Sequence, residues 1–224
     1  MQFLLKKLYF NQMKKALILD LDNTIYPVSS ISENLFGTLF DVLDQHAEMI
    51  NRDSDNTVNK IKDEMTRRPF QHIADEFNLD TDVRNKMVDM LRNMAYSQPM
   101  KPFEDYPHIR DSSLDKFLVT TGFSKLQWSK VRMLGIEDDF KHIHIVDPDV
   151  SQQTKKDVFA EIMETHNYVP ADLLVIGDDP ESEIKAAQAL DIETVLYDPW
   201  NKYPTKISTY RIDSMKAVPG ILAE

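Results

Sequence analysis

The sequence of 224 residues contains no cysteine. Disulfide bonds, catalytic thiolates and cysteine–metal sites are therefore excluded, which fits a reducing compartment. The sequence also has no excess of basic residues. It contains 26 lysines and arginines and 37 aspartates and glutamates, which gives a formal charge of −11. We therefore expect neither nucleic acid nor an anionic membrane as the main partner, although a small anionic substrate can still bind a locally positive site.

Long apolar runs are also missing. No stretch of the sequence approaches the roughly 20 apolar residues that a membrane-spanning helix needs. The N-terminal segment is apolar but is interrupted by Lys6 and Lys7, and it lacks the continuous apolar core and the cleavage site of a signal peptide. We expect a cytoplasmic protein that could equally start at Met13, with residues 1–12 as a dispensable extension.

Glycine is almost absent between residues 32 and 96, where apolar residues such as Leu35, Leu39 and Leu43 recur at helical spacing. This pattern predicts an inserted domain of about four helices, with a polar break at 51–57 and a helix start near Pro69. The proline-containing segment 97–102 is the expected linker. We therefore predict a core formed by residues 1–28 plus 101–224, and a helical cap domain at 29–100.

Outside the insertion, short apolar segments alternate with helical patterns. Strands are expected at 16–19, 116–120, 143–146, 173–176, 193–196 and 210–212, and helices at 124–134, 154–165 and 181–190. Thr154 and Asp157 resemble a capping box, and Gly135 is a suitable helix C-cap. The order predicts an α/β fold with a doubly wound, Rossmann-like parallel sheet. His142 and His144 would share a face of the third strand, where we expect ordinary strand-edge residues.

Polar side chains follow three of these strands. Asp20 and Asp22 follow the first strand, and they would point the same way if strand geometry continued. Because the carboxyl ends of parallel strands meet at one edge of a sheet, residues distant in sequence should converge there. The converging residues are Asp20, Asp22, Thr120, Asp178 and Asp179, with Lys155 or Lys156 at an intervening helix start. Carboxylates, a hydroxyl and a lysine together predict a Mg²⁺-assisted phosphate site.

These motifs resemble those of the haloacid dehalogenase superfamily of hydrolases. The family's Asp-x-Asp-x-Thr motif matches residues 20–24, its strand-end Ser or Thr matches Thr120, and its lysine matches Lys155 or Lys156. Its acidic motif matches residues 177–183. The helical insertion occupies the position of the family's C1 cap. Three departures are Thr121 in place of a frequent asparagine, Glu183 in place of a frequent aspartate, and the missing Lys-Pro of the third motif.

The resemblance implies a role for each matching residue. Asp20 would be the nucleophile that forms an aspartyl-phosphate, and Asp22 the general acid and base. Lys155, with Lys156 as the alternative, and Thr120 would stabilise the phosphoryl group. The implied phosphate-binding set is Asn23, Thr120, Thr121, Gly122 and Lys155. The implied Mg²⁺ ligands are Asp20, the backbone carbonyl of Asp22, and Asp178, with Asp179 and Glu183 in support.

Residues 20–27, followed by serines, resemble the pyrimidine 5′-nucleotidase-like branch of this family. We therefore expect a Mg²⁺-dependent phosphatase for a small phosphorylated metabolite, with a nucleoside 5′-monophosphate as one candidate, acting as a monomer or small homo-oligomer. Three alternatives remain: a sugar-phosphate mutase, a hydrolytic dehalogenase and a non-catalytic binding or regulatory module. Asp22 argues against a dehalogenase, because dehalogenase relatives generally lack the second aspartate.

Overall fold

The computed structural model describes residues 13–50, 56–66, 68–204 and 206–223. The predicted extension 1–12 and most of the predicted polar break, 51–55, lie outside the described residues. A six-stranded sheet forms the centre, in the order β3-β2-β1-β4-β5-β6, and every pairing is parallel. The predicted α/β fold class is confirmed. The strands are β1 (Ala16–Leu19), β2 (Asp115–Thr121), β3 (His142–Val146), β4 (Leu173–Gly177), β5 (Glu193–Tyr197) and β6 (Tyr210–Ile212).

Strand β1 lies between β2 and β4 and is buried on both faces, which explains its uninterrupted apolar sequence. Leu17 and Leu19 belong to one hydrophobic cluster, whereas Ala16 and Ile18 belong to a second cluster on the opposite face. The alternation of side chains along a strand thus divides the core into two layers.

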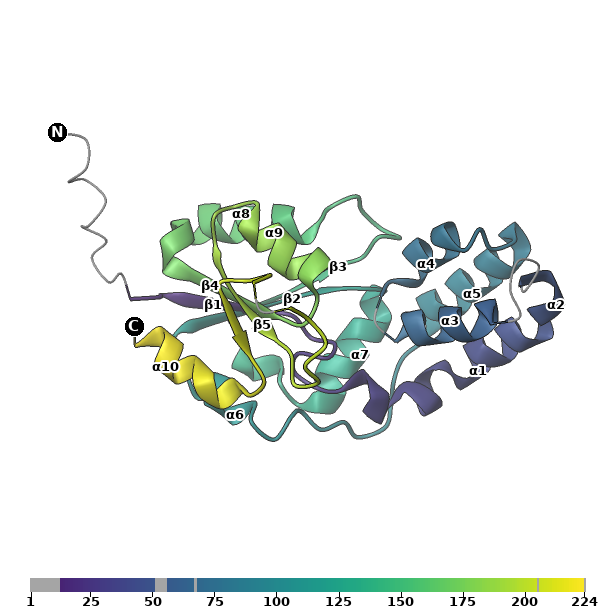
Figure 1. The fold of residues 1–224 in the computed structure, drawn as a ribbon, viewed down its shortest axis with the longest axis horizontal. Coiled ribbons are helices and arrows are strands. Elements are labelled where there is room, and N and C mark those ends of the chain that lie inside the picture. Colours follow the sequence, from purple (N-terminus) through teal and green to yellow (C-terminus); the bar gives the residue numbers. More distant parts are fainter. Residues whose placement is uncertain (1–12, 51–55, 67, 205, 224) are drawn as a thin grey trace.

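Helices cover both faces of the sheet (Figure 1). α8 (Lys155–His166) and α9 (Lys185–Gln188) pack on one face, and α6 (Pro107–Arg110), α7 (Ser124–Leu134) and α10 (Val218–Leu222) pack on the other. The predicted capping box of Thr154 and Asp157 opens α8, and Gly135 ends α7 in the left-handed conformation. The helix predicted at 181–190 is instead a π-helical turn, Pro180–Ile184, followed by the short α9.

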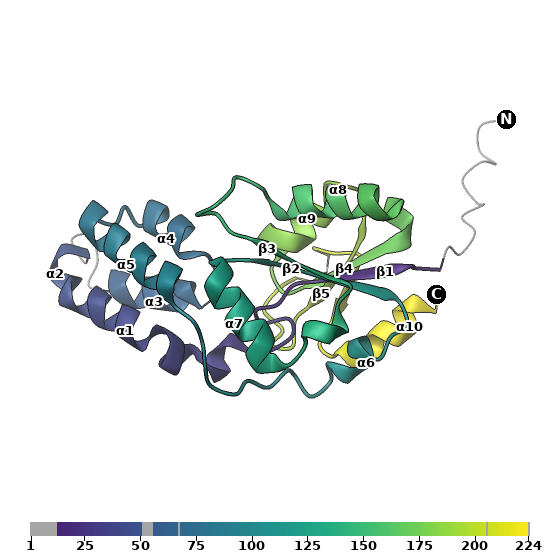
Figure 2. The same cartoon turned by 180° about the vertical axis from the view of Figure 1, so that it is seen from behind.

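The insertion forms a group of helices beyond the carboxyl ends of the strands, which we call the helical lobe (Figures 1 and 2). Within the described residues it contains five helices rather than about four, because the chain turns at His46 and separates the one-turn α2 from α1. As predicted, Pro69 precedes the start of a helix. The lobe helices are α1 (Ser32–Gln45), α2 (Ala47–Ile50), α3 (Thr57–Met65), α4 (Phe70–Glu76) and α5 (Thr81–Asn93).

The chain leaving the lobe is attached to α7. The N–H of Tyr96 donates to the hydroxyl oxygen of Ser129 at 2.7 Å, in a buried position. The N–H of Met100 donates to the carbonyl of Met133 at 3.3 Å. α7 therefore contacts both the sheet and the exit of the lobe. None of the helices in the described ranges combines the length and apolarity needed to cross a membrane.

Candidate active site

The loop after β1 separates the two aspartates that the sequence places side by side. The strand ends at Leu19, and the chain then turns, with Asn23 in the left-handed region at φ 56°. Asp22 lies beyond the end of the strand, in a loop where it forms an isolated parallel bridge with Tyr26. Asp20 contacts α8, whereas Asp22 contacts α7 on the opposite face of the sheet.

Lys155 is the lysine that reaches the site. Its Nζ donates to Oδ1 of Asp20 at 2.7 Å and to Oε2 of Glu183 at 2.8 Å, and the residue is 7% exposed. Burial opposes its charge, but the carboxylates of Asp20 and Glu183 raise the pKa of Lys155 above its ordinary value. Lys156 is exposed to solvent, because the capping box fixes the first turn of α8 with Lys155 inward.

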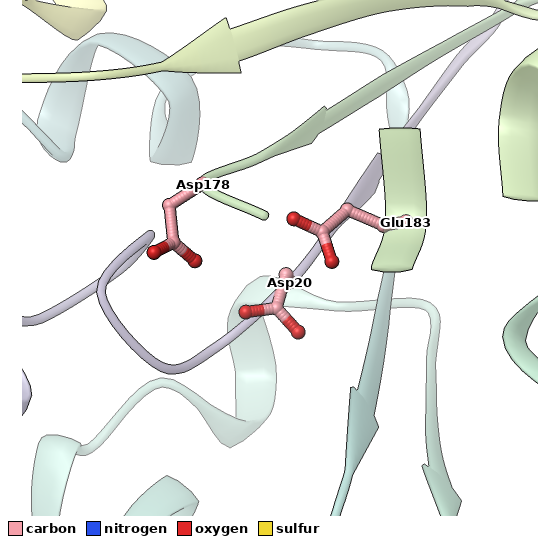
Figure 3. Close-up of side chains that lie close together, drawn as sticks. All are labelled: Asp20, Asp178 and Glu183. Atoms are coloured by element: carbon pink, nitrogen blue, oxygen red, sulfur yellow. The ribbon is translucent and has the colours of Figure 1, made fainter. Parts of the chain in front are cut away.

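Three carboxylates lie close together at this site (Figure 3). Asp20 follows β1, Asp178 follows β4, and Glu183 lies on the π-helical turn; one oxygen from each lies within 4.8 Å of the others. Burial, together with Glu183 and Asp22, raises the pKa of Asp20 to about 7 against the opposing charge of Lys155. Burial, together with the carboxylates of Glu183, Asp20 and Asp179, raises the pKa of Asp178 well above its usual value. The cluster is thus costly to ionise without a further cation.

Glu183 enters this cluster because Gly177 has no side chain. A Cβ on Gly177 would lie 2.1 Å from Oε1 of Glu183, so only glycine permits this approach. Oε1 of Glu183 accepts the N–H of Asp179 at 2.7 Å, while the Asp179 side chain accepts the N–H of Glu181 at 2.8 Å. Of the two residues predicted to support the metal, Glu183 therefore joins the cluster, and Asp179 caps the turn.

The Asp22 carboxylate is held by three side chains. Nζ of Lys130 lies 2.8 Å and 3.0 Å from its two oxygens, Nε2 of Gln127 donates at 3.0 Å, and the hydroxyl of Tyr26 donates as well. Burial alone would raise the pKa of Asp22, but the charge of Lys130 and the three hydrogen-bond donors lower it.

Sequence reasoning missed Lys130, Gln127 and the role of Tyr26. A signal was present, because Gln127 and Lys130 occupy the buried stripe of α7 that also contains Leu126 and Val131. Polar residues at apolar positions of an amphipathic helix indicate a buried polar partner.

Some of the predicted phosphate-binding residues line the site cavity, and one supports a neighbouring loop instead. The hydroxyl of Thr120 is buried and accepts Nε2 of Gln127 at 2.8 Å. Gly122, at φ 151°, lies against Gln127, which is 3.1 Å from the position of a Cβ. The side-chain oxygen of Asn23 accepts the N–H of Val28 at 3.1 Å and supports the loop that enters the lobe. Thr120, Thr121 and Gly122 line the site cavity, whereas Asn23 lies outside its lining.

A cavity of about 340 Å³ joins these groups to the helical lobe. The strand ends, the π-helical turn and α8 contribute the carboxylates, Thr120 and Lys155, and the lobe contributes both apolar and polar side chains. A phosphate group at the carboxylates would therefore place the rest of a small substrate against the lobe. The lining side chains from the lobe include Phe36, Met65, Arg68, Phe70, Gln71 and His72.

This arrangement of strand-end carboxylates and lysine agrees with the comparison with known protein families. The sequence model of the haloacid dehalogenase-like hydrolases matches residues 14–191. The chain belongs to the haloacid dehalogenase-like hydrolases. The match covers β1 to the end of α9, and thus the whole site and the helical lobe.

Curated relatives of this hydrolase include a glyceraldehyde 3-phosphate phosphatase from Pyrococcus furiosus. It is 22% identical over 198 residues, which cover 84% of this chain and 81% of the relative. HAD-hydrolase YfnB from Bacillus subtilis is 30% identical over 111 residues, which cover 48% of this chain and 47% of the relative.

Solved structures show the same fold. The magnesium-bound crystal structure of YfnB superposes with a TM-score of 0.62 at 23% identity, covering 95% of this chain and 100% of that one. L-2-haloacid dehalogenase from Xanthobacter autotrophicus superposes with a TM-score of 0.58 at 12% identity, covering 94% of this chain and 99% of that one. At these identities the superpositions bear on the fold and not on the substrate.

Proposed function

We propose that this hydrolase is a Mg²⁺-dependent phosphatase that cleaves a small phosphate monoester through an aspartyl-phosphate on Asp20. One observation carries the proposal: Asp20 lies between a buried lysine and two further carboxylates, at a cavity that also contains Asp22. The similarity to a glyceraldehyde 3-phosphate phosphatase supports the same class of reaction.

The residues divide the reaction into two steps. In the first, a carboxylate oxygen of Asp20 bonds to phosphorus while the bond from phosphorus to the leaving oxygen breaks. Lys130 and the hydrogen-bond donors favour the ionised form of Asp22, so the first step uses its minor, protonated form, which gives its proton to the leaving oxygen and becomes a carboxylate. That carboxylate then takes a proton from the water molecule that attacks phosphorus and releases Asp20, which restores the protonated form. Lys155 and the hydroxyl of Thr120 hold the phosphoryl oxygens during both steps.

The carboxylate cluster fits a magnesium ion. Its donors are oxygens from Asp20, Asp178 and Glu183, which are the ligands that Mg²⁺ prefers. Asp20 and Glu183 are buried and Asp178 is half-buried, and the one lysine that contacts the cluster does not neutralise three carboxylates. Asp20 and Asp178 would hold the ion with the backbone carbonyl of Asp22, and Glu183 and Asp179 would support them. When bound, the ion would neutralise charge on Asp20 and on the phosphoryl group.

We also propose that residues 29–100 act as a cap on a core formed by residues 1–28 and 101–224. The position of the lobe over the carboxyl ends of the strands, and its share of the cavity lining, support this division. The substrate is then a small phosphorylated metabolite that fits about 340 Å³. A nucleoside 5′-monophosphate is one candidate, in keeping with the resemblance of residues 20–27 to pyrimidine 5′-nucleotidases.

Two other reactions remain to be tested against this proposal. A hydrolytic dehalogenase would use Asp20 on carbon, and the fold of the Xanthobacter autotrophicus dehalogenase is similar. Asp22 favours phosphate, because a phosphate ester needs its leaving alcohol protonated. A sugar-phosphate mutase would use the same motifs, and it would convert a sugar phosphate without releasing inorganic phosphate.

The decisive measurement is release of inorganic phosphate from an aryl phosphate, with Mg²⁺ and with excess chelator. We expect turnover only with Mg²⁺, and none for Asp20→Asn. Asp178→Asn should raise the Mg²⁺ concentration needed for half-maximal rate, whereas Asp179→Asn, whose side chain caps the neighbouring turn, should raise it less. Full activity in chelator would overturn the metal requirement, and chloride release from 2-chloropropionate without phosphatase activity would favour the dehalogenase.

A further inference from the structure

Lys130 is a buried ammonium that the two reaction steps do not use. It is 4% exposed and lies on the inward face of α7, among the apolar residues Leu126, Val131 and Leu134. Its Nζ lies 2.8 Å from one oxygen of Asp22 and 3.0 Å from the other. A charged group in such an apolar stripe costs folding free energy, so a buried ion pair by itself is weak evidence for a stabilising role.

The carboxylate that Lys130 contacts needs support, because Asp22 lies on a loop. Strand β1 ends at Leu19, so the ladder of the sheet does not fix the direction of Asp22. The two remaining donors come from Tyr26 and Gln127, and the Lys130 ammonium also lies 5.9 Å from the centre of the Tyr26 ring. A reacting group on a loop must be held by neighbours whose own positions are fixed by packing.

Lys130 shares its face of α7 with Gln127. Gln127, one turn earlier on α7, donates to both Asp22 and the hydroxyl of Thr120, so the same helix face aligns the two motif residues. Both Gln127 and Lys130 line the cavity that contains Asp20. The hydrogen bonds from Lys130 and Gln127 to Asp22 are therefore part of the site and are not remote surface contacts.

We propose that Lys130 is a positioning residue, which holds the Asp22 carboxylate where it can exchange protons with the leaving oxygen and with water. This proposal rests on the phosphatase function. Loss of Lys130 should then damage the same part of the reaction as loss of Asp22, and it should leave binding of substrate and of Mg²⁺ largely intact. A purely structural ion pair would instead lower stability without selectivity for one chemical step.

The test compares Lys130→Met with Lys130→Arg and with Lys125→Met, a lysine of the same helix whose Nζ donates to the carbonyl of Asn93. For an alkyl phosphate, we expect Lys130→Met to lower kcat by about 10- to 100-fold, as for a misplaced catalytic group, with KM changed less than twofold. The loss of kcat/KM, which reports the first step, should be several-fold smaller for p-nitrophenyl phosphate, which needs little protonation to leave. Lys130→Arg should recover part of kcat, and Lys125→Met should match the wild type.

A double-mutant cycle separates positioning from structure. In an Asp22→Asn background, Lys130→Met should cause little further loss of kcat, because the group that it positions has already been replaced. Additive losses, equal losses of kcat/KM for both leaving groups, or a change in KM alone would overturn the proposal. If Lys130→Met does not fold, Tyr26→Phe removes another donor to Asp22 with a smaller loss of stability. It should show the same dependence on leaving group, with a smaller loss of rate.

Measurements on the wild type and on Asp22→Asn separate a failure of this proposal from a failure of the proposed phosphatase function. Absence of Mg²⁺-dependent hydrolysis of any phosphate ester by the wild type would overturn both. If the wild type is active and Asp22→Asn depends on the leaving group as expected, but Lys130→Met does not, then only the role of Lys130 is overturned.

Discussion

Lys155 and Lys156 are neighbours of the same type with opposite surroundings. Lys155 is buried against Asp20 and Glu183, and Lys156 is exposed. Lys155→Met should abolish measurable turnover and lower the free energy of unfolding by about 3–5 kcal/mol, because it leaves buried carboxylates without their cation. Lys156→Met is the matched control and should change neither by a measurable amount. Phosphate release and urea unfolding check both variants, and equal effects at the two positions would contradict the assignment of Lys155.

Alanine substitution can test the role of Gly177 in the same way, with Gly37 as the matched control position. Gly177→Ala would place a Cβ 2.1 Å from Oε1 of Glu183, so Glu183 must move away from Lys155. We expect stability to fall by about 1–3 kcal/mol, as in overpacked cores, and turnover to fall with it. Gly37 lies inside α1 with nothing within 4 Å of its Cβ position. Gly37→Ala should raise stability by about 0.5–1 kcal/mol, and thermal unfolding of both variants measures the difference.

His142 and His144 on β3 and His166 on α8 lie close together, and the half-buried His144 should make stability depend on pH. Burial, with repulsion from His142 and His166, lowers the pKa of His144 below 6.5 despite the nearby Glu161. The unfolded chain therefore binds more protons than the folded protein near this pH, and stability rises with pH there. The contribution of His144 is present above pH about 6.5 and is lost as the pH falls through the folded pKa.

Urea unfolding at pH 5.5 and pH 7.5 measures this contribution. The difference in free energy of unfolding between the two pH values should be smaller for His144→Asn than for the wild type. Both proteins should be measured in chelator, so that titration of the carboxylate cluster is common to them. Identical differences for the two proteins would show that His144 does not contribute.

Helices and strands with local signals were predictable. The capping box of Thr154 and Asp157 and the left-handed Gly135 depend on neighbours within one turn, and both were confirmed. The strand order and the convergence at one edge follow from general rules for parallel sheets. The π-helical turn at 180–184 was not predictable, because it depends on Glu183 folding back over Gly177.

Contacts that depend on distant residues were also beyond sequence reasoning. Gln127 and Lys130 are 105 and 108 residues from Asp22, and no local pattern joins them to it. Asp22 lies in the loop after β1, and its carboxylate is held there by side chains of Tyr26, Gln127 and Lys130. The sequence therefore predicted that Asp20 and Asp178 lie close together, but not that Asp179 caps a turn instead of joining them, nor which partners hold each carboxylate.

At the scale of the whole molecule, the ion pair of Arg92 with Asp149 joins the lobe to the loop after β3, and it is the contact to test. Arg92 on α5 donates through Nε at 2.6 Å and through Nη2 at 2.9 Å to Asp149, in the loop after β3. If the lobe moves as a cap, Arg92→Ala should favour the open arrangement and speed amide hydrogen exchange at 28–30 and 97–102. Arg84→Ala, which breaks a pair with Asp75 inside the lobe, is the matched control.

Vanadate, a phosphate mimic, should slow exchange in the same two segments of the wild type, because closure would shield them. Hydrogen exchange with mass detection measures both effects. If exchange is unchanged while vanadate is demonstrably bound, the lobe does not move as a cap. If Arg92→Ala and Arg84→Ala have equal effects on exchange, the Arg92–Asp149 pair does not stabilise the closed arrangement.

The bond from Tyr96 to Ser129 has an evolutionary consequence. The lobe side of this bond is a main-chain N–H, which every residue except proline supplies. The attachment of the lobe to α7 therefore makes almost no demand on the lobe's own sequence. Mutations that alter the lobe surface and the molecules it accepts can accumulate between residues 31 and 95 without releasing this anchor. Diversification of specificity is in this way separated from preservation of the chemistry.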